Sequence, residues 1–212
     1  FKETITNKNK DALNPKIIFK NYKTLLSNKN FFILCICAGI PLAWIMSYVN
    51  IAPFLFINKL HVSVVMFGWI TFIIGIGNII GKLSNAFVIK KYTVLRTINY
   101  GLLLGLSTSC LLFIISFINL DNKLINIYSI TASVLLMQFG VGLIISNTPA
   151  LALVPFKHIS GSASAMYRSL QQAVAFITSA ILTALPWHNS WTLAISIGSL
   201  SILGVILLRI NK

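Results

Sequence analysis

Charged residues are scarce in this chain. Only 9% of its 212 residues are charged and 57% are hydrophobic, whereas about a quarter of the residues in a soluble domain are charged. Several apolar runs also reach the roughly 18 residues that are needed to cross a bilayer. A soluble globular fold is therefore excluded, and the sequence predicts an integral membrane protein.

Acidic residues are the scarcest of all. The chain has three Asp or Glu against 17 Lys or Arg, and none of the three, Glu3, Asp11 and Asp121, lies within an apolar run. Proton relays and sodium sites inside a membrane normally need a carboxylate. We therefore expect that this chain on its own does not couple any process to an ion gradient.

Cysteine and histidine are also few and dispersed. Three cysteines do not make a disulfide framework, because Cys35 and Cys37 are two residues apart and point to different faces of one helix. The histidines fall in separate loops without carboxylate or cysteine neighbours: His61, His158 and His188. No glycine-rich phosphate loop occurs. We predict no metal site, no cofactor and no enzyme activity.

The apolar runs themselves predict an all-α, polytopic membrane protein with six transmembrane helices. A basic segment, residues 1–30, precedes a transmembrane domain, residues 31–212. The segment from Lys16 to Ser27 is either an amphipathic helix on the cytoplasmic leaflet or a solvated linker. The predicted spans are 31–57, 64–89, 95–118, 125–152, 160–185 and 190–208.

The net charge of +14 indicates topology rather than nucleic-acid binding. Nearly all Lys and Arg fall on one side of the six predicted spans, and only Lys59 and Lys123 fall on the other. The positive-inside rule then places both termini in the cytoplasm of a bacterial-type inner membrane. Trp187 and Trp191 fall at the outer interface, where aromatic belts form.

Carboxamide side chains are concentrated in four of the spans. Amides in hydrocarbon are unfavourable unless they meet a partner or water, so their positions indicate helices that face protein or a cavity. They lie in the first, second, fourth and fifth spans: Asn50, Asn78, Asn85, Gln138, Asn147, Gln171 and Gln172. The third and sixth spans carry mainly Ser, Thr, Gly and aliphatics, and we expect them to face lipid.

The stretch from Gln138 to Gln172 is the most distinctive in the chain. Pro149 and Pro155 interrupt one apolar run near a short basic turn, and the small-residue series SGSASA opens the next run. It resembles the bicyclomycin-resistance-like (Bcr/CflA) branch of the major facilitator superfamily. The matching residues are Asn147, Ala150, Ala152, Pro155, Phe156, Gly161, Ser162, Ala163, Ser164, Ala165 and Gln171.

This resemblance implies one half of a twelve-helix, proton-coupled multidrug efflux carrier that works by alternating access. The chain would be the C-terminal half, built from two three-helix inverted repeats. The implied substrate cavity consists of Trp44, Tyr48, Asn50, Asn78, Gln138 and Gln171. A cytoplasmic latch would consist of Gly81, Asn85, Lys90 and Lys91, although a plain positive-inside loop also explains the lysines.

Arg168 departs from the family pattern, because we expect a small residue there. It is either a cytoplasmic anchor or a buried cation that pairs with a carbonyl or with an acid of the other half. The expected partners are the lipid bilayer, a small amphipathic substrate and an N-terminal six-helix half, either on the same longer chain or separately encoded, which would supply the proton chemistry. The alternatives are a truncated or vestigial membrane protein without transport activity and a homodimeric six-helix carrier.

Overall fold

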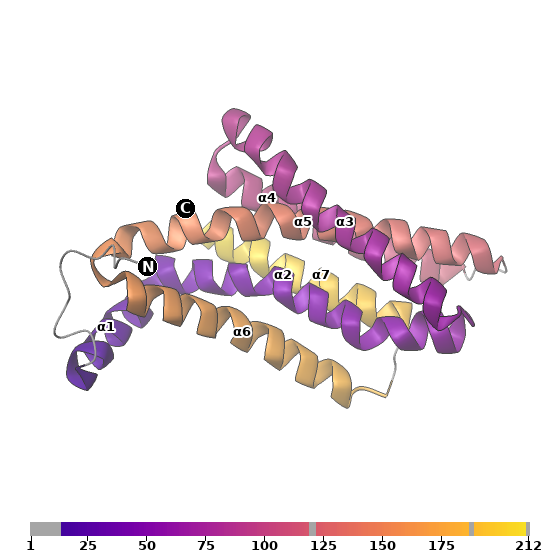
Figure 1. The fold of residues 1–212 in the computed structure, drawn as a ribbon, viewed down its shortest axis with the longest axis horizontal. Helices are drawn as coiled ribbons and strands as arrows, with labels where there is room; N and C mark the ends of the chain where they lie inside the picture. The colour runs from indigo at the N-terminus through magenta and orange to yellow at the C-terminus, as the bar shows by residue number, and fades with distance from the viewer. Residues whose placement is uncertain (1–13, 119–121, 187–188, 211–212) are drawn as a thin grey trace, which may run out of the picture.

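The structure is a computed structural model that describes residues 14–118, 122–186 and 189–210, and the predictions for Trp187, His188 and residues 1–13 lie outside these ranges (Figure 1). Every regular element in the described ranges is a helix. The elements are α1 (Pro15–Ser27), α2 (Lys29–Pro53), η1 (Phe54–Lys59), α3 (Val64–Lys91), α4 (Val94–Ile118), α5 (Lys123–Leu153), η2 (Val154–Ile159), α6 (Ser160–Ala184) and α7 (Ser190–Ile210).

Short polar side chains start several of these helices. Asn14 accepts a hydrogen bond from the Lys16 amide at 3.1 Å, and Asn28 accepts one from the Phe31 amide at 2.9 Å. Ser63 caps α3 and Asn122 caps α5 in the same way. Each cap satisfies an amide that has no partner within its helix. The helices therefore begin close to the predicted positions.

The predicted all-α, membrane-spanning class is confirmed in its coarse form. Five uninterrupted helical runs in the described residues are long and apolar enough to cross a membrane, and the longest, Lys123–Ala184, contains both α5 and α6. Helices α2 to α7 thus correspond to the six predicted spans. The largest difference is at Pro53, where α2 ends and the π-helix η1 continues the path to Lys59.

The predicted turn between the fourth and fifth spans is also helical. It forms the short 3₁₀ helix η2, which opens with Val154 and Pro155. Two residues leave helical geometry, Phe156 with φ −111° and ψ 29° and Ile159 with φ −125° and ψ 36°. The path from α5 into α6 therefore reverses direction without an irregular loop.

Four helices form the centre of the bundle, and two lie at its edges (Figure 1). Helices α2 and α5 contact each other, and α4 and α7 contact each other and complete the centre. Helix α3 packs mainly on α5, and α6 packs mainly on α2. Helices α3 and α6 are therefore the edge helices, although the sequence led us to expect that the third and sixth spans would be peripheral.

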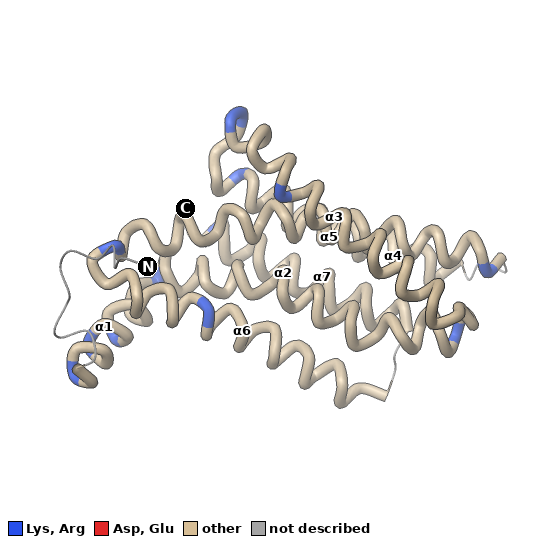
Figure 2. The backbone as a smooth tube through the Cα atoms, viewed as in Figure 1, with Lys and Arg blue, Asp and Glu red and all other residues tan. Residues whose placement is uncertain are grey.

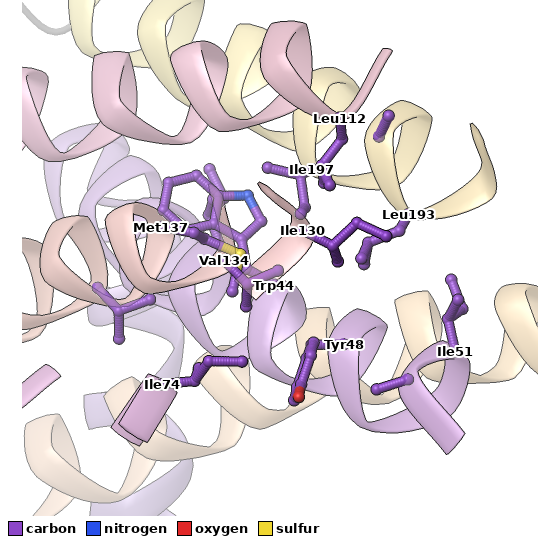
Figure 3. Packing of buried hydrophobic residues seen from close by; sticks show 14 of the residues in the cluster. Trp44, Tyr48, Ile51, Ile74, Leu112, Ile130, Val134, Met137, Leu193 and Ile197 are labelled. Carbon is purple, nitrogen blue, oxygen red and sulfur yellow. The ribbon is translucent and has the colours of Figure 1, made fainter. Parts of the chain in front are cut away.

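The apolar core lies between the central helices (Figure 3). Trp44 of α2 lies beside Val134 and Met137 of α5 and Ile197 of α7, and all four side chains are fully buried. In the most apolar stretch of α7, 44% of the residues are buried, against 22% in α3. Helix α7 thus contributes a larger share of its residues to the buried interior than α3 does.

All charged side chains in the described part of the chain are basic, because its three acids lie outside it (Figure 2). Lys59 at the end of η1 and Lys123 at the start of α5 lie at one end of the bundle, where Lys123 donates a hydrogen bond to the His61 carbonyl at 3.1 Å. The opposite end, which we call the basic end, carries α1, η2 and the helix ends that contain Lys90, Lys91, Arg96, Lys157 and Arg209. Between the two ends lie Lys82 and Arg168, and both are exposed, so no described Lys or Arg is buried.

Candidate functional site

The predicted site residues are concentrated along two helix contacts, which we call the polar seams. The α3–α5 seam contains Asn78, Gly81, Asn85, Gln138 and Asn147. The α2–α6 seam contains Asn50, Arg168 and Gln171. Each seam joins one edge helix to the centre of the bundle.

Glycines bring the backbones of α3 and α5 into direct contact. A Cβ atom at Gly142 would lie 2.6 Å from the carbonyl oxygen of Asn78 and 2.7 Å from the amide nitrogen of Lys82. A Cβ atom at Gly81 would overlap the carbonyl oxygen of Phe139. Only glycine fits at these two positions without displacing backbone, which is how small residues serve membrane helix contacts generally.

Asn85 and Asn147 meet in this seam, near the C-terminal ends of α3 and α5. The Asn147 Nδ2 donates a hydrogen bond to Asn85 Oδ1 and also to the Leu143 carbonyl at 2.7 Å. Asn85 is 8% exposed and Asn147 is 3% exposed. The sequence placed Asn85 in a latch and Asn147 in a family motif, and the structure brings the two groups together in one buried pair.

Gln138 and Asn78 lie in the same seam and are half-buried. Gln138 packs next to Gly77, and its buried Oε1 has no hydrogen-bond partner among the described residues. A buried amide oxygen normally has a partner, so this atom marks a place where water or a ligand would be stabilised.

The α2–α6 seam is held by a chain of three groups. Arg168 Nη1 donates to Gln171 Oε1 at 3.1 Å, and Gln171 Nε2 donates to the carbonyl oxygen of Ala38 at 3.1 Å. Gln171 is 1% exposed, whereas Arg168 is exposed and lies 5.8 Å from the Tyr167 ring. Gln171 therefore joins α6 to α2, and Arg168 presents its charge on the outer side of the seam.

Two further predicted residues form contacts between helices. Asn50 Nδ2 donates to the Ser179 hydroxyl of α6 at 2.8 Å. The hydroxyls of Tyr48 and Thr71 lie 3.3 Å apart and connect α2 to α3. Both residues thus contact an edge helix.

Trp44 lies in the packed core. Its side chain is fully buried, and a Cβ at Gly105 of α4 would lie against its indole ring. The indole Nε1 has no partner among the described residues. The role of Trp44 in a substrate cavity stays a prediction.

The remaining latch and motif residues lie at the basic end. Lys90 and Lys91 are exposed, and their Nζ atoms lie 5.9 Å from the Phe87 ring and 5.7 Å from the Tyr92 ring, so both cations contact aromatic rings of their own segment. Ser162 accepts a hydrogen bond from Asn21 of α1 at 3.4 Å. Gly161 and Ser164 are exposed, as is Pro155, while Pro149 is half-buried inside α5.

Sequence reasoning missed the bond between Thr148 and Tyr167. Their hydroxyls lie 2.9 Å apart and both side chains are buried, so the bond joins α5 directly to α6. A tyrosine four residues before Gln171 lies on the same helix face as that amide, and this spacing was the available signal. In the described residues, no group of His, Cys, Asp or Glu is placed to hold a metal.

The site thus consists of amide and hydroxyl groups that bind one another across helices. Such groups can form hydrogen bonds with a polar or amphipathic molecule, but they carry no titratable carboxylate. No known protein family matches this chain, and no curated protein matches it either.

Proposed function

We propose that this chain is one six-helix half of a proton-coupled carrier that exports small amphipathic molecules. In this proposal it belongs to the bicyclomycin-resistance-like branch of the major facilitator superfamily, in a bacterial-type inner membrane with both termini in the cytoplasm. The observation that carries the proposal is the repeated packing pattern of the six long helices.

That pattern is preserved when the first three long helices are exchanged with the last three. The exchange replaces α2 by α5, α3 by α6 and α4 by α7. It converts the α3–α5 contact into the α6–α2 contact, and the α4–α5 contact into the α7–α2 contact, and all four contacts are observed. Because α2 and α5 run in opposite directions, this arrangement is the one expected of inverted repeats.

The edge helices support the proposal because each buries only one narrow stripe. In α3 the buried residues are Ile70, Ile74, Gly77, Gly81 and Asn85, and in α6 they are Ala163, Tyr167, Gln171, Ala175 and Leu182. Large apolar side chains cover the rest of α3, for example Phe72 at 62% exposure. The exposed face of α6 combines small and polar residues with Phe176 at 74% exposure, Ile177 and Ile181. A second six-helix half would pack against these faces.

The hydrogen bonds across the polar seams hold the edge helices to the centre of the bundle, so the six helices can move as one unit when a carrier rocks. The substrate cavity would lie next to the α3–α5 and α2–α6 seams, where Gln138 has an amide oxygen without a partner among the described residues. The described residues hold no carboxylate. In this proposal the proton-binding acid therefore belongs to the other half, and Arg168 lies on the exposed side of α6 where such an acid can reach it.

The decisive experiment expresses the chain with the six-span half that its own genome encodes, either in the same reading frame or in a neighbouring gene. Cells carrying both halves should export ethidium, and a protonophore should abolish the export. Neither half alone should do so. Absence of export with both halves present in the membrane would refute the carrier and favour a vestigial protein.

A matched pair of variants tests whether the other six-helix half packs against α6. Phe176→Gln changes an exposed residue of α6, and Ile202→Gln changes an exposed residue of α7, which is not an edge helix. We expect the first variant to lose co-purification with the other half and the second to retain it. Equal behaviour of the two variants would contradict docking through α6.

A further inference from the structure

A pocket at the basic end lies between the start of α4 and the end of α7. It has a volume of about 470 Å³, which falls within the range of small-molecule sites. Its polar side chains are Thr93, which precedes α4, Arg96 and Asn99 of α4, and Arg209 of α7. Its apolar wall consists of Leu95, Leu103, Val205 and Leu208.

The two arginines in this pocket have no acidic partner in the described residues. No Asp or Glu occurs within residues 14–118, 122–186 or 189–210, and both guanidinium groups are exposed. Two cations that line one cavity repel each other unless an anion lies between them. Arginine is well suited to bind such an anion when it is a phosphate, because its planar fork donates two parallel hydrogen bonds.

The backbone fixes where one of these arginines lies. The Thr93 hydroxyl accepts a hydrogen bond from the Arg96 amide at 3.4 Å, and the Thr97 amide donates to the Thr93 carbonyl at 3.0 Å. Arg96 is therefore in the first turn of α4, where the helix dipole also favours negative charge. The first turn of α4 and the last turn of α7 thus approach the same volume from two helices.

The polarity of the pocket changes along the helices. Arg96, Asn99 and Leu103 are spaced three and four residues apart, so they lie on one face of α4 with the cation at its end and the aliphatic side chain about 10 Å further in. On α7, Val205 lies one turn inside Arg209 in the same way. Leu103 is 42% exposed. A soluble anion uses only the outer part of such a pocket, whereas an amphiphile uses both parts.

We propose that this pocket binds an anionic phospholipid, with Arg96 and Arg209 on the phosphate. Asn99 donates a hydrogen bond to the headgroup, and an acyl chain lies along Leu103 and Val205. Basic pockets between membrane helices commonly recognise anionic headgroups. The proposal depends on neither the carrier function nor a second half, because all its residues belong to α4 and α7 and their junctions.

The test measures lipid retention by the purified full chain with native mass spectrometry, using equal amounts of phosphatidylglycerol and phosphatidylcholine. The wild type should retain phosphatidylglycerol preferentially. R96Q/R209Q should weaken that retention at least about tenfold, because charge-assisted bonds to phosphate are lost. K90Q/K91Q removes the same charge from exposed residues outside the pocket and should change retention less than about twofold.

Two further measurements keep the result decisive. Leu103→Gln alters only the apolar wall and should weaken phosphatidylglycerol retention even if the double arginine variant fails to fold. Inorganic phosphate at millimolar concentration should not displace the lipid. Equal losses in the arginine and lysine variants would overturn the site in favour of general electrostatic attraction, and displacement by inorganic phosphate would overturn the lipid as its ligand.

Discussion

The centre and the edges of this bundle use different side chains for the same purpose. In the centre, small hydroxyls connect the helices: Ser47 and Ser196 lie 2.6 Å apart, and Ser109 donates to the Ala194 carbonyl at 2.7 Å. At the edges, longer side chains do so: amides of Asn and Gln, as in the bond from Gln171 to Ala38, and tyrosine hydroxyls, as in the bond between Thr148 and Tyr167. Short hydroxyls permit close packing, whereas longer amides and tyrosines have the reach to hold an edge helix that has fewer neighbours.

The largest expected effect comes from closing the space between α3 and α5. Gly81→Ala places a methyl group against the backbone of Phe139, and we expect the free energy of unfolding to fall by about 2–3 kcal/mol. Gly75→Ala on the same helix is the control, because nothing lies within 4 Å of its Cβ. Unfolding in mixed micelles measures both. Equal stability of the two variants would show that the edge contact is loose.

Removing one amide from the edge should have the next largest effect. Asn147→Leu leaves Asn85 buried without its partner, and we expect a loss of about 1–3 kcal/mol in the free energy of unfolding. Ser146→Ala is the adjacent control, because the Ser146 hydroxyl is exposed and bonds only to the Gly142 carbonyl of its own helix. Equal losses of stability in the two variants would contradict a stabilising role for the Asn85–Asn147 pair at the edge.

Double-mutant cycles compare the two regions directly. Thr148→Val with Tyr167→Phe tests the bond between α5 and edge helix α6, and Ser47→Ala with Ser196→Ala tests the bond between central helices α2 and α7. Hydrogen bonds between membrane helices average about 0.6 kcal/mol, so we expect coupling of about this size in both cycles. A coupling several times larger in only one region would show that the hydrogen bonds differ in strength as well as in reach.

The smallest effect is expected at Arg168. Arg168→Gln removes an exposed charge at the edge of α6 and leaves the Gln171 bond to Ala38 in place. We expect the free energy of unfolding of the isolated chain to change by less than about 0.5 kcal/mol. Thermal unfolding of wild type and variant measures this. A large loss would mean that Arg168 belongs to the interior of the seam.

The helices were the most predictable part of the molecule. Apolar runs of bilayer length allow only helical backbone or closed barrels, and polar residues such as Asn28 and Ser63 mark where the helices begin. The amides also identified the seams, because Asn85, Asn147 and Gln171 all bond across helices. An amide side chain is so unfavourable in hydrocarbon that each of these residues required a hydrogen-bond partner.

The direction of a side chain around its helix was harder to predict. Trp44 and Tyr48 are one turn apart and were expected to line one cavity, but Trp44 packs beside Gly105 of α4 and Tyr48 reaches Thr71 of α3. The contacts that Ser and Thr make between helices were missed for the same reason. A hydroxyl can satisfy itself on its own helix, as Ser201 does on the Ile197 carbonyl, so composition alone does not reveal which hydroxyls also reach a neighbour.

The short helix η2 has a mechanical consequence. Between Lys123 and Ala184 the backbone leaves helical geometry at Phe156 and at Ile159, and the bond between Thr148 and Tyr167 braces the junction of α5 and α6 just inside the turn. A displacement of α6 therefore acts directly on the end of α5. The junction from α3 to α4, at the same basic end, consists only of Tyr92 and Thr93 between two separate helices and has no such helical segment.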